Sequence, residues 1–336
     1  MLLSHNFKIE IFSEVEPDPS LKTFENLYSK FEKSEVSLFI GVGGGSVMDV
    51  TKLVAQALSQ KRSPCKYACG DIIPNEKGVP VMLVPTTSGT GSEVSDIVVL
   101  KLDNGNKKFL KNSYYFPDIV IIDPLLTISM PQNVTAICGV DALSHAIEGI
   151  MHKNSNPFTY TFGFSSIEII SKYLRKAIAD GENLEARYYM SIAAMFGMMA
   201  MCASGTALYA HSASFVITKY KHTPHGVGCA LGLPYIMDFN MPVITNKLAK
   251  IANAMGEQTL MLSEWGKAKT AVCSVINFIR DCGLPVCLKE YGGINKSDLE
   301  EMADMMITMY PRPMNPRIMT REDSVKYWHN MWDGKI

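Results

Sequence analysis

The segment from Leu38 to Lys52, LFIGVGGGSVMDVTK, joins a short apolar run to four glycines, a serine and the start of a helical pattern. Short apolar runs bounded by glycine are typical of buried parallel strands. Glycines at such a turn allow positive φ and let backbone N–H groups approach a ligand, and the following helix N-terminus favours a phosphate. The third glycine of the usual dinucleotide fingerprint is replaced by Ser46. The segment therefore predicts a strand, a turn and a helix suited to phosphate, with a tight turn that binds nothing as the alternative.

The rest of the chain shows two kinds of sequence pattern, one with strands and helices and one with helices alone. Apolar runs at 36–40, 79–84, 96–100 and 118–123 predict strands, and 47–60 predicts a helix between the first two. After Pro131 the strand signals stop, and helical patterns follow at 133–151, 157–179, 183–209, 224–239, 243–255 and 262–282. We therefore expect a Rossmann-like α/β parallel-sheet domain over 1–131 and an all-helical domain over 132–336.

Composition narrows the class of protein. The 336 residues carry 32 basic and 33 acidic side chains, and this balance, without a basic cluster, argues against a nucleic-acid partner. Eight scattered cysteines without Cys-x-x-Cys spacing, and the lack of a cleavable signal, favour a reduced cytoplasmic chain. The stretch 188–218 lacks charged residues and is long enough to cross a bilayer, but it contains Gly205 and His211. We interpret it as a helix buried in the helical domain, with no membrane partner.

Two groups of residues predict ligands. A hydroxyl-rich turn with Thr86, Thr87 and Thr90 follows the strand at 79–84. This turn and the glycine loop, at adjacent strand ends, together indicate a bound dinucleotide more strongly than either loop does alone. Asp141 and His145 are spaced i, i+4 on one helix, while His211 and His225 belong to other helices. Each of these four has an ordinary alternative as a surface, core or capping residue. Together they are the kind of set that binds a divalent transition metal.

Most of these residues lie in motifs that resemble the iron-containing (group III) alcohol dehydrogenase family over nearly the whole chain. The motifs are Gly43-Gly44-Gly45-Ser46 with Asp49, the stretch from Pro85 to Glu93, Asp123-Pro124, the stretch from Gly139 to Glu148, Glu185-Ala186-Arg187, His225-Gly226 and Asn315-Pro316-Arg317. The resemblance implies a dehydroquinate synthase-like architecture with NAD(P) and a metal between the two domains. It also implies hydride transfer between nicotinamide and a metal-polarised small aldehyde or alcohol, in a homodimer.

The resemblance assigns roles residue by residue. It implies a metal held by Asp141, His145, His211 and His225, with Fe²⁺ expected from the family and Zn²⁺ equally suited to these ligands. It places Gly43, Gly44, Gly45 and Ser46 at the pyrophosphate with Asp49 nearby, Thr86, Thr87 and Thr90 along the cofactor, and Lys108 near the ribose.

The sequence departs from the family pattern at two places. A histidine that family members commonly carry four residues after the third ligand is Phe215 here, and His222 is a candidate to take part of its role in proton relay. The resemblance also implies that the first strand and helix of the nucleotide domain are missing and that 8–12 is its second strand, which leaves NAD and NADP both open. The alternatives to an alcohol dehydrogenase are a zinc polyol dehydrogenase, a hydroxyacid–oxoacid transhydrogenase and a non-catalytic paralogue.

Overall fold

The computed structural model describes residues 8–336, which form two compact units. One unit ends at Val84 and is completed by Asp96–Ile121, and the other consists of Pro85–Ser95 and Ile122–Ile336. The hydroxyl-rich turn thus belongs with the helical unit. The predicted boundary between residues 131 and 132 stays a prediction.

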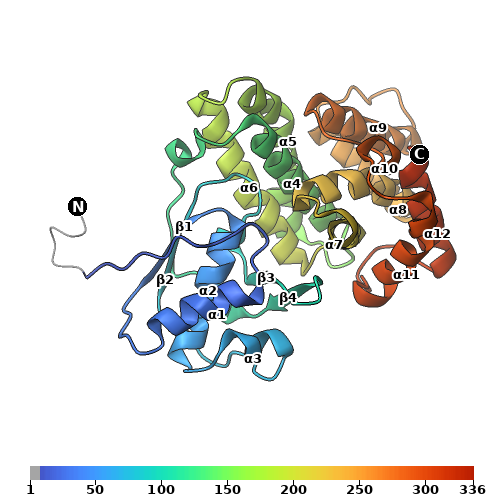
Figure 1. Cartoon of the computed structure of the whole chain (residues 1–336). Coiled ribbons are helices and arrows are strands. Elements are labelled where there is room, and N and C mark those ends of the chain that lie inside the picture. The colour runs from blue at the N-terminus through green and yellow to red at the C-terminus, as the bar shows by residue number, and fades with distance from the viewer. Residues whose placement is uncertain (1–7) are drawn as a thin grey trace. The chain divides into compact units, whose positions relative to one another are not determined.

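The first unit contains a small parallel sheet and a separate hairpin (Figure 1). The sheet has the order β1 (Phe39–Gly43), β2 (Val81–Pro85), β5 (Ile119–Val120), and β2 pairs in parallel with β5. The hairpin pairs β3 (Ile97–Lys101) antiparallel with β4 (Lys107–Lys111). The predicted α/β character of the N-terminal part is confirmed.

Helix α2 (Gly45–Ser59) is buried from Met48 to Ala57 because it packs on two sides. Met48 and Ala55 lie against Val81 and Leu83 of the sheet. Val50, Leu53 and Val54 join a second core with α1 (Leu21–Phe31), α3 (Pro64–Cys69) and β3. An apolar helix enclosed in this way has little freedom to move, so its N-terminus is a firmly held part of the unit.

The predicted strand at 8–12 is wrong, since these residues form no strand in the described chain. Ile9 and Ile11 alternate with charged residues as a strand would, but Ile11 is 76% exposed. A strand needs a partner that its local pattern cannot supply. The apolar patterns also did not predict α1, α3 or β4, and the KKFLK sequence of β4 has only two apolar residues.

The second unit is helical throughout its larger segment and has one extensive core. Its helices are α4 (Gln132–Met151), α5 (Pro157–Ala179), α6 (Leu184–Ser204), α7 (Tyr209–Lys221), α8 (His225–Ala254), α9 (Glu264–Asp281), α10 (Leu288–Tyr291), α11 (Leu299–Met309) and α12 (Arg321–Asp333). Helix α8 bends at Ile244, two residues after Pro242, so the two helices predicted at 224–239 and 243–255 correspond to its two arms.

The helix predicted at 183–209 is shorter than expected. It ends at Ser204, Gly205 adopts φ 127°, and α7 leaves at 109° to α6. Gly205 accepts this backbone because it has no Cβ. The turn matters for function because it places His211 on a separate helix.

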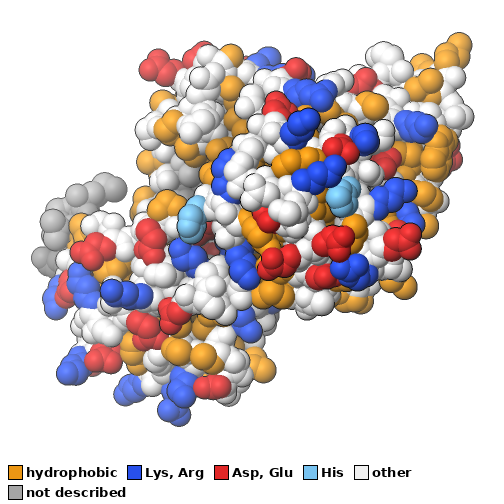
Figure 2. Space-filling model, turned by 45° about the vertical axis from the view of Figure 1, so that its right-hand side comes forward, with side chains coloured by type: hydrophobic (Ala, Val, Ile, Leu, Met, Phe, Trp, Pro, Cys, Tyr) orange, Lys and Arg blue, Asp and Glu red, His pale blue; other side chains and the backbone are white. Residues whose placement is uncertain are grey.

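Helices α4 and α8, and the bent pair of α6 and α7, are long and apolar enough to cross a membrane by length and composition. The apolar windows of α4 and α8 are 83% and 78% buried inside the protein. Their apolar surface is therefore already covered by protein, as expected for core helices. Basic and acidic side chains are interspersed on the face shown in Figure 2.

Candidate metal and nucleotide sites

Three helices bring the four predicted metal ligands together. Helix α4 carries Asp141 and His145 one turn apart, α7 carries His211, and α8 begins at His225. The N-terminus of α8 comes close to α4 because Gly226 has no side chain: a Cβ there would lie 2.4 Å from the carbonyl oxygen of Ile137. The ligands thus converge from segments up to 84 positions apart, a closeness that spacing along the chain could not establish.

The side chains of this cluster lie within a few ångströms of one another. Asp141 Oδ1 is 3.8 Å from His225 Nε2 and 4.0 Å from His145 Nε2. The His145 and His211 rings stack with centroids 4.9 Å apart, and the His211 and His225 centroids are 5.2 Å apart. Asp141, His145 and His211 are at most 4% exposed.

Two buried polar atoms of the cluster show whether its residues fit a metal ion. Asp141 Oδ1 and His211 Nε2 are buried and have no hydrogen-bond partner among residues 8–336. An unsatisfied buried polar atom costs about 1–3 kcal/mol, so native proteins rarely retain one without a reason. A carboxylate oxygen and imidazole nitrogens are ligands that divalent transition metals prefer. The residues present therefore fit the metal that the motif implies.

The protonation states of the cluster suit metal binding. Burial lowers the pKa of His145 to about 4, although the Asp141 carboxylate acts in the opposite direction. Burial acts to raise the pKa of Asp141, but the three neighbouring histidines outweigh it and hold that pKa below its ordinary value. Near neutral pH the cluster thus offers an ionised carboxylate and a neutral His145 ring, which are the ligating forms.

Glu148 is a functional residue to which the sequence motifs assign no role. It is fully buried on α4, hydrogen-bonds His211 Nδ1 and accepts a 2.7 Å bond from the Ala210 N–H. Arg312, from the chain after α11, lies near enough to favour its ionised form. A carboxylate on the outer nitrogen of a ligating imidazole fixes the ring's tautomer and orientation. The available signal was its position, three residues after His145 on the same helix face.

We expect Glu148→Gln to lower metal affinity about 10- to 100-fold, since the amide retains an acceptor but loses the charge that makes His211 a better ligand. Competition with a chromophoric chelator measures this affinity. Glu168→Gln, on the exposed side of α5, is the matched control and should bind metal like wild type. A Glu148→Gln affinity within twofold of wild type would contradict the assigned role.

The predicted pyrophosphate loop lies at the N-terminus of α2. Gly44 is the N-cap residue and provides no side-chain cap, so no capping side chain covers the first-turn amides. The glycines of this loop do not adopt positive φ, contrary to the expectation from the sequence. Close packing requires Gly43 instead, since a Cβ there would lie 2.6 Å from the Val47 side chain.

The other residues of this region have structural contacts. Ser46 Oγ accepts a 3.2 Å bond from the Asp18 N–H. Asp49 accepts a 2.9 Å bond from the Val99 N–H and pairs with Lys52 at 3.4 Å, so it joins α2 to β3. Lys108 is half-buried on β4, opposite Leu100.

The turn carrying Thr86, Thr87 and Thr90 packs on helices of its own unit. A Cβ on Gly89 would lie 2.6 Å from the Cys138 Cβ on α4, and one on Gly91 would lie 2.2 Å from the Met198 Cβ on α6. Gly91 also has φ 60°. Thr87 Oγ1 is buried without a partner among the described residues, so it is available to a bound molecule.

His222 lies outside the cluster. It is exposed, ends α7 and adopts φ 24°. Phe215 instead faces the ligands, stacking on His225 with centroids 5.4 Å apart and contacting Tyr310 at 5.3 Å. Its ring forms an apolar wall beside the cluster, where the family pattern has an imidazole. The role of His222 in proton relay stays a prediction.

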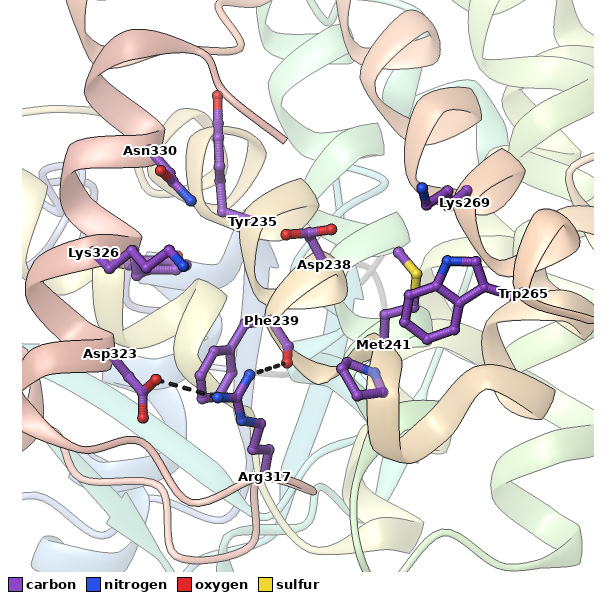
Figure 3. Close-up of a pocket in the computed structure, with 12 residues that line it drawn as sticks. Tyr235, Asp238, Phe239, Met241, Trp265, Lys269, Arg317, Asp323, Lys326 and Asn330 are labelled. Atoms are coloured by element: carbon purple, nitrogen blue, oxygen red, sulfur yellow. Dashed lines mark hydrogen bonds and ion pairs between the residues drawn. The ribbon is translucent and has the colours of Figure 1, made fainter.

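A cavity of about 260 Å³ opens elsewhere in the helical unit, between α8, α9 and α12 (Figure 3). Asp238, Lys269 and Lys326 line it, and Arg317 bonds the Phe239 carbonyl and pairs with Asp323 at its edge. None of its lining residues belongs to the metal cluster. The convergence of metal-ligating atoms, and not this cavity, identifies the candidate active site.

The proteins that this chain resembles belong to a metal-dependent family, in agreement with a cluster of metal ligands. Residues 1–124 match the family described as iron-containing alcohol dehydrogenase, and 135–332 match the C-terminal domain of the Fe-containing alcohol dehydrogenase family. Long-chain-alcohol dehydrogenase 1 of Geobacillus thermodenitrificans is 35% identical over 90% of this chain and 76% of its own length. The 1,3-propanediol dehydrogenase of Klebsiella pneumoniae is 32% identical over 92% and 80%.

Solved structures show the same fold. A 1,3-propanediol oxidoreductase superposes with a TM-score of 0.93 at 30% identity, covering 98% of this chain and 86% of the other. A sulfoacetaldehyde reductase from Bifidobacterium kashiwanohense, in complex with NAD⁺, superposes with a TM-score of 0.87 at 26% identity, covering 96% and 83%. The chain therefore belongs to the iron-containing alcohol dehydrogenase family and is an oxidoreductase that acts on alcohols.

Proposed function

We propose that this protein reduces small aldehydes with NADH, and oxidises the corresponding primary alcohols with NAD⁺, at a divalent ion held by Asp141, His145, His211 and His225. The observation that carries the proposal is the pair of buried, unpartnered ligand atoms, Asp141 Oδ1 and His211 Nε2, among neighbouring imidazoles. When bound, the ion polarises a carbonyl oxygen as a Lewis acid and nicotinamide supplies the hydride.

The protein's own residues prepare this reaction. Glu148 orients the His211 ring through Nδ1, and Ser214 Oγ lies 2.8 Å from His225 Nδ1 and orients the second ring. Phe215 places apolar surface beside His225, and Tyr310 packs on the Phe215 ring. Asp141, His145 and His211 are at most 4% exposed, and charge interactions among such buried groups are stronger than in water.

The names of the relatives define the substrate class that we propose. They include dehydrogenases of long-chain alcohols, 1,3-propanediol and methanol, and reductases of sulfoacetaldehyde and lactaldehyde. A terminal CH–OH or aldehyde group is common to these compounds. Iron as the metal, a homodimer and a cytoplasmic location are further expectations from the family.

The proposed function is tested by following NADH and NADPH oxidation with a panel of short aldehydes and the metal-loaded enzyme. We expect turnover that depends on the aldehyde and on added free NADH. Turnover between a hydroxy acid and an oxo acid without added cofactor would favour the transhydrogenase alternative. Full metal occupancy without turnover of any aldehyde would favour a non-catalytic paralogue.

We propose that the N-terminus of α2 binds the pyrophosphate of the cofactor through Gly43, Gly44, Gly45 and Ser46. In the same unit, Asp49 is proposed to lie near the pyrophosphate and Lys108 near the ribose. Thr86, Thr87 and Thr90 are proposed to contact the rest of the cofactor. The uncapped first-turn amides and the buried, unpartnered Thr87 hydroxyl support this assignment. A helix N-terminus carries partial positive charge that attracts phosphate.

A negative charge placed at the N-terminus of α2 should weaken NADH binding without lowering the stability of the fold. We expect Ser46→Glu to raise the Kd for NADH more than about tenfold, because a carboxylate occupies the place of the phosphate, while the helix dipole keeps the fold stable. Isothermal titration measures the Kd. Lys22→Glu, at the same second position of α1, is the matched control and should leave the Kd unchanged. An unaltered Kd in Ser46→Glu would remove the pyrophosphate from this loop.

A further inference from the structure

A sulfur atom lies within the metal cluster. Cys229 follows His225 by one turn of α8, is fully buried, and places its Sγ 3.7 Å from His225 Nε2. Ligand atoms of Asp141, His211, His225 and Cys229 all lie within 4.8 Å of one another. This set of four has Cys229 where the set implied by the family has His145.

We propose that Cys229 Sγ is a direct donor to the divalent ion, in an inner shell that contains one carboxylate oxygen, imidazole nitrogens and one sulfur. The proposal rests on the metal site of the proposed function and adds a donor to it. The buried, unpartnered Asp141 Oδ1 and His211 Nε2 are independent signs that an ion belongs at this point.

The position of the thiol suits a ligand. Gly228 lets α8 press against α7, since a Cβ there would lie 2.5 Å from Ser214 Oγ. The close approach of the two helices holds Cys229 against the cluster. Ligand atoms around one zinc ion are separated by about 3.3–3.6 Å at bond lengths of about 2.0–2.3 Å. The 3.7 Å and 3.8 Å separations of His225 Nε2 from Cys229 Sγ and Asp141 Oδ1 require only small side-chain movements to reach this range.

Binding costs the thiol its proton. On coordination the S–H bond breaks, the proton passes to solvent, and the sulfur donates an electron pair to the ion without any change of oxidation state. A bound divalent ion offsets this cost because coordinating thiols are deprotonated outright. A soft sulfur donor shifts the preference of the site toward Zn²⁺ and away from Mn²⁺ and Mg²⁺.

X-ray absorption of the zinc-loaded wild-type enzyme tests the donor set without any substitution. We expect a sulfur scatterer at about 2.3 Å in addition to nitrogen and oxygen at about 2.0–2.2 Å. A shell of nitrogen and oxygen alone would overturn the sulfur donor and leave the proposed function intact. Failure to bind one equivalent of Zn²⁺ would overturn both.

Cobalt loading identifies the sulfur. The Co²⁺ enzyme should show the near-ultraviolet sulfur-to-cobalt charge-transfer band, and Cys229→Ser should lose it while still binding Co²⁺. Cys282→Ser, at another buried cysteine at the end of α9, is the matched control and should keep the band. A band that persists in Cys229→Ser, or is missing from the wild-type Co²⁺ enzyme, would contradict the proposal.

Discussion

The variant Asp141→Ala is expected to lose its metal and to lower kcat/KM for aldehyde reduction about 10³-fold or more. The Asp141 carboxylate is the one negative donor in the set Asp141, His145, His211 and His225, and its Oδ1 lies 3.8–4.0 Å from two of the imidazoles. Lewis-acid stabilisation of the transition state is worth several kcal/mol, and each 1.36 kcal/mol is tenfold in rate.

Metal content per protein chain, measured alongside the steady-state rate, checks this expectation. Chelator should lower the melting temperature of the wild-type enzyme, because an ion that binds only the native state stabilises it, and should leave Asp141→Ala unchanged. Asp238→Asn is the matched control, since this half-buried carboxylate lines the separate cavity. Stoichiometric metal in Asp141→Ala would contradict the assignment.

The variant Arg187→Met is expected to lower the free energy of unfolding by about 3 kcal/mol or more. The buried guanidinium donates to the Gly181 carbonyl at 2.8 Å, to Thr135 Oγ1 at 2.8 Å and to the Met130 carbonyl at 3.1 Å. It thereby joins α6 to the start of α4. Its removal leaves buried acceptors unsatisfied, at about 1–3 kcal/mol each before relaxation.

Thermal unfolding of the metal-loaded enzyme measures this loss. Arg175→Met on α5 is the control, because Arg175 is half-exposed and its ion pair with Asp281 is worth at most about 1 kcal/mol. A change in Arg187→Met no larger than in Arg175→Met would show that the buried hydrogen bonds do not stabilise the fold. The Glu185-Ala186-Arg187 motif would then require a different explanation.

What could be predicted from the sequence was the local part of the structure. The strand, turn and helix around Gly43 follow from apolar periodicity and glycine, and the helix at 157–179 has the bounds that its pattern predicts. The strand expected at 8–12 failed because strand formation depends on a partner elsewhere in the chain. Asp49 has a role as an anchor for β3, which depends on a contact 50 residues away.

In the candidate site, too, some residues could be predicted from the sequence, while others depend on contacts between distant segments. Asp141, His145 and His225 could be selected because the motifs carry them, and His211 because the family resemblance assigns a ligand to its position. Glu148 and Cys229 could not be assigned, because their value depends on contacts with His211, 63 positions away, and with Asp141 on a different helix. The reason for Gly41, close packing on Thr51 and Leu83 in place of positive φ, likewise appears only when α2 lies against the sheet.

The most direct test of the account is the metal dependence of aldehyde reduction. The enzyme is stripped with a strong chelator, dialysed, and assayed for aldehyde-dependent NADH oxidation before and after addition of one equivalent of Fe²⁺ or Zn²⁺ without oxygen. We predict that the stripped enzyme is inactive and that the added ion restores turnover in wild type and not in Asp141→Ala. Full turnover by the metal-free enzyme would contradict the account.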